Sequence, residues 1–285
     1  MSMRTLRFSK MHGIGNDFVL LDCRQQPMSL DVAQIQALGN RHTGVGFDQL
    51  ISIEPAHDAT SAFAYGVWNA DGTRAGQCGN GVRCVAAWLH RAGELALNKA
   101  VQLASPSDAV SVRLLGANEV TVDMGKPVFA PASIPFVADL MAAAYAITVG
   151  AETISIGAVS MGNPHAVLRV EDLEDPHLQQ LGPALSGHLR FPQGANAGFV
   201  HILDRAHVLL RVHERGAGWT RACGSGACAA VAVLQQSGDV DASVQVDLPG
   251  GTLQIARADT GESLWMTGAA AFAFDGEWPI PGNGF

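Results

Sequence analysis

The stretch QCGNGVRCVAAWL, residues 77–89, returns 145 positions later as ACGSGACAAVAVL, residues 222–234. Each copy begins with a Cys-Gly-x-Gly motif, led by Cys78 in the first and Cys223 in the second. The glycines permit a tight turn, and the apolar run after them predicts a buried helix. Each cysteine should therefore occupy a helix start, where unpaired N–H groups and the positive end of the helix dipole lower the pKa of a thiol.

The same offset of 145 residues persists outside the two motifs. Asn69 lies nine residues before Cys78, as Glu214 lies nine residues before Cys223, and Gly93 returns as Gly238. A period of this length is too long for a solenoid repeat, so it indicates two similar domains that arose by duplication. We expect an active site in the cleft between them, since pockets often form where domains meet.

Composition and charge narrow the class of protein. The chain has 285 residues, about two ordinary domains, with 48% hydrophobic residues and a formal net charge of −8. Its Lys and Arg residues form no cluster, which argues against a nucleic-acid partner. Neither a membrane-length apolar run nor the apolar core of a secretory signal is present, so we expect a cytoplasmic protein without membrane contact.

The five cysteines fit no disulfide framework and should be free thiols. Cys84 and Cys228 fall six and five residues into their helices, so they face away from the motif cysteines at about 100° per residue. We interpret both as buried packing residues, together with Cys23 at the end of an apolar strand. Cys78 and Cys223 remain as the chemical candidates.

Short β-branched runs surround the two helices and predict strands. These runs lie at 18–22, 50–53, 62–68, 101–103, 110–115, 120–122, 166–170, 199–203, 208–212 and 246–248. Shorter helices are predicted at 29–38 and 176–185. The pattern favours an α+β fold in which each half is a mixed sheet, or barrel, wrapped around a central helix.

The predicted domains are residues 1–126 and 127–271, with the segment from about 272 to 285 returning to the first half. The Pro-rich stretch 126–135 is the best candidate for a linker.

Three other chemistries could use the same residues. The segment 224–229 matches the G-x-G-x-x-A dinucleotide fingerprint, but the Gly-rich stretch 214–222 separates it from the preceding strand. Zinc would need closely spaced ligands, whereas His12, His42 and His165 are dispersed and neither motif has a second ligand nearby. A redox dithiol would normally be a C-x-x-C on one helix, although two distant sulfurs that approach each other could still oxidise.

Five motifs, in order and over nearly the whole chain, resemble the diaminopimelate epimerase family. They are KMHGIGNDFVLLD (10–22), NADG followed by QCGNG (69–81), SMGNPHAV (160–167), ANAGFV (195–200) and ERGAGWTRACGSGACAA (214–230). The resemblance implies an enzyme that interconverts LL- and meso-diaminopimelate, on the route to lysine and peptidoglycan, without pyridoxal phosphate or a metal. It also implies a small-molecule substrate enclosed between pseudo-symmetric domains and, commonly, a homodimer.

The resemblance assigns Cys78 and Cys223 as the thiolate and thiol on opposite faces of the α-carbon. His165 and Glu214 match positions that tune the protonation of the two thiols. The α-carboxylate would be held at the two helix starts by Gly79, Asn80, Gly224 and Ser225. The remaining substrate-binding positions, besides Glu214, are Asn16, Gln49, Asn69, Asn163, Asn196 and Arg215. No cofactor and no metal is expected.

Two alternatives use the same fold. A proline racemase or hydroxyproline epimerase also acts through two cysteines, but its motifs usually place His at the position of Asn80 and Thr at that of Ser225. Its cyclic substrates would not need Arg215. A non-enzymatic thiol switch is the other alternative, and it would not wash solvent deuterium into a substrate.

Overall fold

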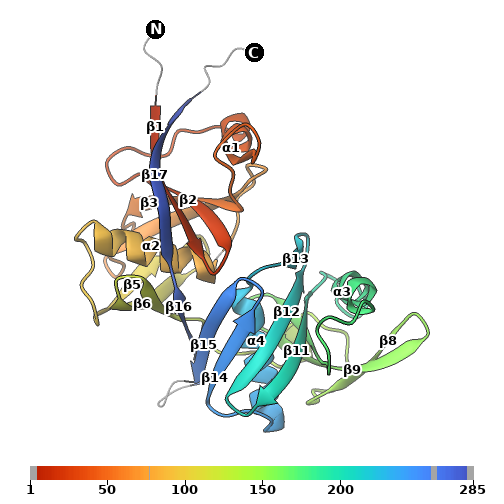
Figure 1. Cartoon of the computed structure of the whole chain (residues 1–285). Coiled ribbons are helices and arrows are strands. Elements are labelled where there is room, and N and C mark those ends of the chain that lie inside the picture. Colours follow the sequence, from red (N-terminus) through yellow and green to blue (C-terminus); the bar gives the residue numbers. More distant parts are fainter. Residues whose placement is uncertain (1–4, 77, 258–261, 281–285) are drawn as a thin grey trace. The chain divides into compact units, whose positions relative to one another are not determined.

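The computed structural model describes residues 5–76, 78–257 and 262–280. The chain divides into two compact units (Figure 1). Residues up to Val122 and from Gly268 onward form unit 1, and Asp123–Thr267 form unit 2. The boundaries predicted from the sequence, after residues 126 and 271, each lie four residues beyond these divisions.

The Pro-rich stretch predicted as a linker lies inside unit 2. Val128 forms a β-bridge with Ser160, residues 131–133 form a single 3-10 turn, and Ile134 is fully buried. Proline here ends regular structure without separating the units, because the stretch packs on the sheet of unit 2.

Unit 1 is a mixed sheet around one buried helix. Its elements are β1 (Thr5–Gly13), β2 (Asn16–Asp22), α1 (Val32–Gly39), β3 (Gln49–Pro55), β4 (Phe63–Asn69), α2 (Gly79–Arg91), β5 (Ala100–Ala104), β6 (Ala109–Gly116), β7 (Glu119–Asp123) and β17 (Ala271–Pro279). Helix α2 packs on β1, β2, β3 and β6. Nine of its thirteen residues are buried, so it forms the centre of this unit.

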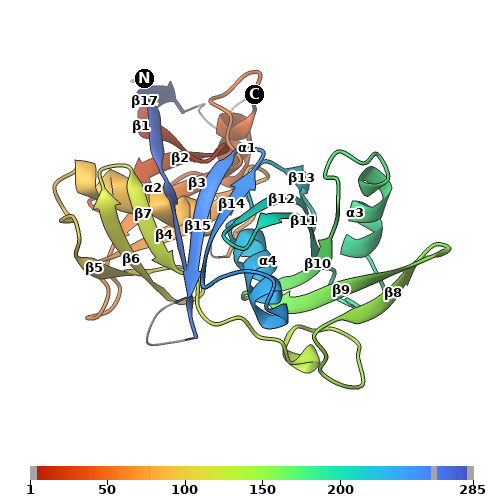
Figure 2. The same ribbon diagram turned by 60° about the horizontal axis from the view of Figure 1, so that its bottom comes forward.

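Unit 2 repeats this plan around helix α4 (Figure 2). Its elements are η1 (Pro131–Ser133), β8 (Tyr145–Val149), β9 (Glu152–Ser160), β10 (Pro164–Arg169), α3 (Leu178–Ser186), β11 (Asn196–Asp204), β12 (His207–Glu214), β13 (Gly218–Thr220), α4 (Gly224–Ser237), β14 (Ser243–Leu248) and β15 (Gly251–Arg257). Strand β16 (Leu264–Ala269) leads out of this unit. Helix α4 packs on β9, β10, β11, β12 and β15.

Strand pairing shows that the two units are copies of one arrangement. In unit 1 the successive pairs from β1 to β6 are antiparallel, parallel, antiparallel, parallel and antiparallel. In unit 2 the pairs β9–β10, β10–β11, β11–β12, β12–β14 and β14–β15 follow the same order of directions. An antiparallel edge strand completes each set, β17 on β1 and β8 on β9. The predicted α+β class with a duplicated mixed sheet around a central helix is confirmed.

The Cys-Gly-x-Gly motifs produce nearly identical helix starts. Cys78 is the N-cap of α2 with φ −127° and ψ 109°, and Cys223 is the N-cap of α4 with φ −127° and ψ 103°. The last glycine of each motif lies close to the sulfur of its cysteine. A Cβ on Gly81 would lie 3.5 Å from the Cys78 sulfur, and one on Gly226 would lie 3.2 Å from the Cys223 sulfur. Each thiol therefore folds back over the first turn of its own helix.

Three local predictions differ from the structure. Helix α1 begins at Val32 rather than 29, because Asp31 caps it and exchanges hydrogen bonds with Gln34 in a capping box. Helix α3 begins at Leu178 rather than 176. The stretch 214–222, expected to be a loop, contains β13, which turns back antiparallel onto β12.

The remaining cysteines are packing residues, as predicted. Cys84 and Cys228 are fully buried in the two central helices, and Cys23 is nearly so. Burial raises the pKa of both Cys84 and Cys23 to about 12, which keeps these thiols protonated. Among the described residues, no helix is both long enough and apolar enough to cross a membrane.

Candidate active site

The first half-site comprises Asn16, Gln49, Asn69, Cys78, Gly79 and Asn80, all in unit 1. Its centre is the start of helix α2. The Gly81 N–H donates to the Cys78 sulfur at 3.4 Å, and the Cys78 thiol lies 3.9 Å from Oδ1 of Asn16. Nδ2 of Asn80 donates to the same Asn16 oxygen at 3.2 Å. The Cys78 sulfur thus has a donor for its thiolate and an acceptor for its thiol.

Gln49 and Asn69 lie at the adjoining ends of β3 and β4. They are direct partners in the antiparallel register, and Nε2 of Gln49 donates to Oδ1 of Asn69 at 3.2 Å. Strand β2 runs parallel to β3, with Phe18 paired to Gln49. Asn16, the first residue of β2, therefore lies at the same end of the sheet. The structure therefore gathers all six predicted residues of the first half-site at one end of its sheet.

The second half-site comprises Asn163, His165, Asn196, Glu214, Arg215, Cys223, Gly224 and Ser225, all in unit 2. Cys223 is only 5% exposed and is a free thiol. Its sulfur lies 3.6 Å from the Ser225 hydroxyl. Glu214 ends β12, nine residues before the cysteine, and its carboxylate accepts a hydrogen bond from the Thr220 hydroxyl at 2.5 Å.

The surroundings of Cys223 favour its protonated form, so the lowered pKa expected at this helix start is wrong for Cys223. Burial raises the pKa of the thiol well above its usual range, and the negative charge of Glu214 raises it further. The Ser225 hydroxyl and the Gly226 N–H act in the opposite direction, because both favour a thiolate. Cys223 also has donors for its thiolate and, in the Glu214 carboxylate, an acceptor for its thiol.

The two half-sites differ in charge at one equivalent position. Asn69 and Glu214 each stand nine residues before their cysteine, and they end β4 and β12, the equivalent strands of the two units. A neutral amide accompanies Cys78, whereas a carboxylate accompanies Cys223. Cys78 is also only half-buried, whereas Cys223 is buried.

His165 is neutral and its tautomer is fixed by Asn163. The ring is 1% exposed, and burial, followed by the positive charge of Arg215, lowers its pKa to about 3. Its Nε2 lies 2.9 Å from Oδ1 of Asn163, an atom that can only accept, so Nε2 carries the hydrogen. Nδ1 therefore keeps a lone pair, and no hydrogen-bond partner for it is found among the residues that the structure describes.

Asn196 begins β11, and Arg215 directly follows the neighbouring strand β12. The Arg215 N–H donates to Oδ1 of the buried Asn196 at 2.9 Å. The Arg215 side chain is directed along the 193–194 turn, where Nη1 donates to the Gln193 carbonyl at 2.5 Å. The backbone of Arg215 is thus fixed while its guanidinium lies exposed at the edge of the half-site.

Sequence reasoning missed two residues that support these groups. Thr220 donates to Glu214, and Asp48 accepts a hydrogen bond from Nδ2 of Asn16 at 2.8 Å. Asp48 directly precedes Gln49, which was the available signal. Thr220 lies in the stretch that was expected to be a loop, so its position against β12 could not be predicted.

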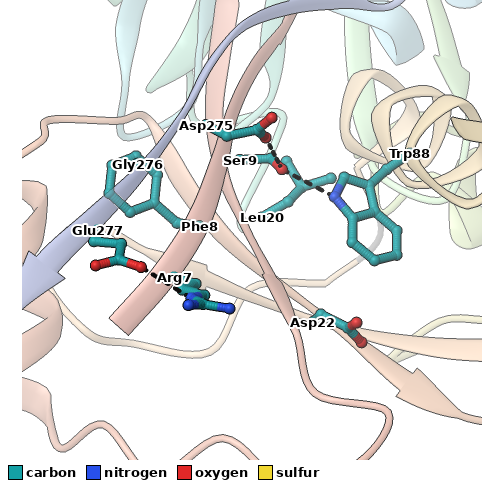
Figure 3. Close-up of a pocket in the computed structure, with 9 residues that line it drawn as sticks. All are labelled: Arg7, Phe8, Ser9, Leu20, Asp22, Trp88, Asp275, Gly276 and Glu277. Carbon is teal, nitrogen blue, oxygen red and sulfur yellow. Dashed lines mark hydrogen bonds and ion pairs between the residues drawn. The ribbon is translucent and has the colours of Figure 1, made fainter. Parts of the chain in front are cut away.

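One hollow in unit 1 is lined by other residues (Figure 3). It has a volume of about 380 Å³ and is lined by residues of β1, β2, α2 and β17, including Phe8, Ser9 and Trp88. The Trp88 indole N–H donates to the Ser9 hydroxyl, which in turn donates to Asp275. None of the predicted site residues lines this hollow. Within the described ranges, no group of three or more His, Cys, Asp or Glu residues is placed to hold a metal ion.

The class of fold is established by solved structures. A hydroxyproline epimerase from Agrobacterium vitis matches with a TM-score of 0.68 at 17% identity, over 96% of this chain and 92% of that one. A probable proline racemase from Agrobacterium radiobacter K84 matches with a TM-score of 0.67 at 14% identity, over 95% and 92%. At these identities the likeness concerns the fold alone, which is the duplicated fold of these epimerases and racemases.

Sequence comparison is more specific. A family model described as Diaminopimelate epimerase matches residues 8–130 and 157–273. A diaminopimelate epimerase from Xylella fastidiosa (strain M12) is 48% identical over 274 residues, 96% of each chain. One from Xanthomonas euvesicatoria pv. vesicatoria (strain 85-10) is 49% identical over the same length. The chain belongs to the diaminopimelate epimerase family, so the resemblance carried by its motifs is confirmed.

Proposed function

We propose that this chain is a diaminopimelate epimerase, an isomerase that interconverts LL- and meso-diaminopimelate without a cofactor. Family membership supports the substrate, and relatives of that name match almost the whole chain. The observation that carries the mechanism is the pair of equivalent helix starts, at which Cys78 and Cys223 have nearly the same backbone conformation, with a neutral amide at Asn69 and a carboxylate at Glu214 nine residues before them.

The two thiols act as the two bases on one α-carbon. In the resting enzyme the less buried Cys78 is the thiolate, while Cys223 keeps its proton beside Glu214. The Cys78 sulfur removes the α-hydrogen, so an S–H bond forms as the C–H bond breaks. The Cys223 thiol then gives its proton to the opposite face of the carbanion and is left as the thiolate. The reverse reaction exchanges the two roles.

A carbanion beside a carboxylate needs stabilisation where its negative charge develops. The N–H groups of Gly79, Asn80, Gly224 and Ser225 lie in the first turns of α2 and α4, at the positive ends of the helix dipoles. These donors bind the α-carboxylate and stabilise the charge that it takes up as the α-proton leaves. Each helix start thus has two roles: it positions a cysteine sulfur, and its N–H groups polarise the α-carboxylate of the substrate.

The remaining polar residues select a substrate with a second amino and carboxylate group. Arg215 binds the distal carboxylate, and the amides of Asn16, Gln49, Asn69, Asn163 and Asn196 complete the hydrogen bonds of a doubly zwitterionic ligand. Proline has no distal groups to meet these side chains. The homodimer and the cytoplasmic location suggested by the family belong to the same proposal.

The test is conversion of LL-diaminopimelate by the purified, reduced protein, followed with a dehydrogenase that consumes the meso product. We expect turnover with diaminopimelate and none with proline. Cys78→Ala and Cys223→Ala should each abolish it, whereas Cys84→Ala and Cys228→Ala, the matched cysteines of the same helices, should keep it. Turnover of proline at a comparable kcat/KM would favour a proline racemase, and no turnover of either amino acid would favour a thiol switch.

A further inference from the structure

The orientation of the Asn16 amide is fixed from its nitrogen side. Its Nδ2 donates to Oδ2 of Asp48 at 2.8 Å, and a carboxylate can only accept, so the NH₂ group must face Asp48. The carbonyl oxygen is thereby turned the other way, where it receives Nδ2 of Asn80 at 3.2 Å and lies 3.9 Å from the Cys78 sulfur. A rotated amide would present a donor to both of these groups instead.

Asp48 is itself held by a network of ion pairs. Its Oδ2 also receives the Asp17 N–H at 3.0 Å, and its Oδ1 receives Arg41 at 2.7 Å. Arg41 forms a two-point pair with the Asp17 carboxylate at 2.7 and 3.1 Å, and the buried Lys10 donates to Asp17 at 2.5 Å. Burial opposes ionisation of Asp17, but the hydrogen bonds and charges of Arg41 and Lys10 lower its pKa to about 2. Arg41 and the backbone of Asp17 thus orient the Asp48 carboxylate, and Lys10 in turn pairs with Asp17.

Unit 2 orients its equivalent asparagine by another device. Asn163 follows Gly162 in the turn between β9 and β10, as Asn16 follows Gly15 between β1 and β2, and both glycines have a positive φ, 88° and 86°. There His165 donates its Nε2 hydrogen to Oδ1 of Asn163 at 2.9 Å. Ala195 precedes Asn196 where Asp48 precedes Gln49, so unit 2 has no carboxylate at that position. Each half-site therefore orients one asparagine amide. Asp48 binds the amide nitrogen of Asn16, whereas His165 binds the amide oxygen of Asn163.

We propose that Asp48 is a positioning residue of the first half-site, which acts through Asn16 to keep a hydrogen-bond acceptor facing the Cys78 thiol. This inference rests on the proposed function and adds a residue to it. Cys78 must hold a proton in one direction of the reaction and release it in the other, and the Gly81 N–H serves only the thiolate. With Asp48 removed, the Asn80 amide alone still orients Asn16, so the rotated amide, which places a second donor on the sulfur, becomes populated. The thiolate is then stabilised too much, and it becomes a weaker base.

The test compares Asp48→Ala and Asp48→Asn with Asp22→Ala and Asp22→Asn. Asp22 is a matched control because it lies in the same unit, pairs with one arginine and has a similar side-chain exposure, 40% against 44%. The rate at which iodoacetamide alkylates Cys78 is measured against pH by peptide mapping. Its midpoint should fall by about one pH unit in Asp48→Ala, as expected when a donor replaces an acceptor. Asp48→Asn keeps one acceptor oxygen, so its midpoint should fall less. The midpoints of both Asp22 variants should match that of the wild type.

Activity gives a second measurement. The kcat/KM for diaminopimelate should fall at least about tenfold in Asp48→Ala, the usual cost of a mispaired hydrogen-bonding group. In an Asn16→Ala background the same change should leave the Cys78 alkylation profile unmoved, because Asp48 acts through the amide. The inference is overturned if the Asp48 and Asp22 variants share one alkylation profile, or if Asp48→Ala only lowers Tm. Alkylation needs no substrate, so it decides the role of Asp48 even if the wild type proves inactive on diaminopimelate.

Discussion

Replacing the last glycine of each Cys-Gly-x-Gly motif with alanine should affect the two cysteines unequally. A Cβ on Gly226 would lie 3.2 Å from the Cys223 sulfur and 3.0 Å from Cγ2 of Val212, so the methyl is compressed from two sides. Restoring an ordinary van der Waals separation requires the sulfur to withdraw by about 0.5 Å. A Cβ on Gly81 would lie 3.5 Å from its sulfur, and its closest contact is the terminal Cδ1 of Ile51 at 2.9 Å, which can rotate away.

The magnitude follows from how strongly the reaction depends on position. Since a misplacement of about 1 Å can cost about 10²-fold in rate, half of that shift should lower kcat/KM of Gly226→Ala about tenfold. Gly81→Ala should stay within about threefold of the wild type, because its sulfur need not move. Overpacking of about 1–3 kcal/mol is partly offset by the better helix propensity of alanine, about 1 kcal/mol, so both variants should fold.

Steady-state kinetics with LL-diaminopimelate, together with Tm, measure these effects. Gly116→Ala is the control, since a Cβ there would meet only the Glu119 Cβ at 3.8 Å. Equal activities in Gly226→Ala, Gly81→Ala and Gly116→Ala would refute the close packing of the Cys223 sulfur on its helix. A larger loss in Gly81→Ala than in Gly226→Ala would reverse the expected order and refute it as well.

Three further predictions concern single residues of the second half-site. Glu214→Gln removes the negative charge that helps to raise the pKa of Cys223. Iodoacetamide should therefore label Cys223 faster at neutral pH, and kcat/KM should fall about tenfold or more; unchanged labelling would contradict this role of Glu214. Arg215→Lys keeps a positive charge but loses the bidentate guanidinium. The decrease in kcat/KM should correspond to a loss of about 2–4 kcal/mol in transition-state binding, and an unchanged kcat/KM would remove Arg215 from the distal site. Burial lowers the pKa of His165 from 6.5 to about 3, so the contribution of the neutral ring to stability is complete above pH 6.5 and is lost as the pH falls toward 3. The Tm of His165→Gln should therefore decrease less than that of the wild type between pH 6.5 and 4. Parallel Tm curves would contradict a buried neutral histidine.

The central helices and the duplication could be predicted because their signals are local. A glycine-rich turn followed by an apolar run indicates a capped, buried helix, and counting the offset between two such runs reveals the repeat. The chain-reversing glycines that follow the helices, Gly93 and Gly238, carried the same information, and both adopt a positive φ in the structure, 82° and 77°. The predicted strand runs all became strands, with ends that differ by a few residues.

The supporting contacts of the half-sites could not be predicted, because they depend on strand register and side-chain rotamers. Nothing in the sequence indicates that Asp48 reaches Asn16, 32 residues away, until β2 and β3 are known to be parallel neighbours. Strand β13 is too short to be recognised, and it exists because the turn after Glu214 folds Gly218 back against it. The tautomer of His165 likewise follows from one hydrogen bond to Asn163 rather than from any motif.

The two-base mechanism is tested most directly by locating deuterium after a brief reaction of LL-diaminopimelate in D₂O, with the isomers separated and weighed by mass spectrometry. If Cys78 removes the α-hydrogen and Cys223 supplies the new one, the meso product carries one solvent deuterium at its inverted α-carbon, because the thiol that delivers it has exchanged with the solvent. The unreacted LL isomer keeps its hydrogen at low conversion, since Cys78 returns what it removed. Meso product that retains the original hydrogen would require a single base to carry the same proton across, and it would contradict the two-thiol mechanism.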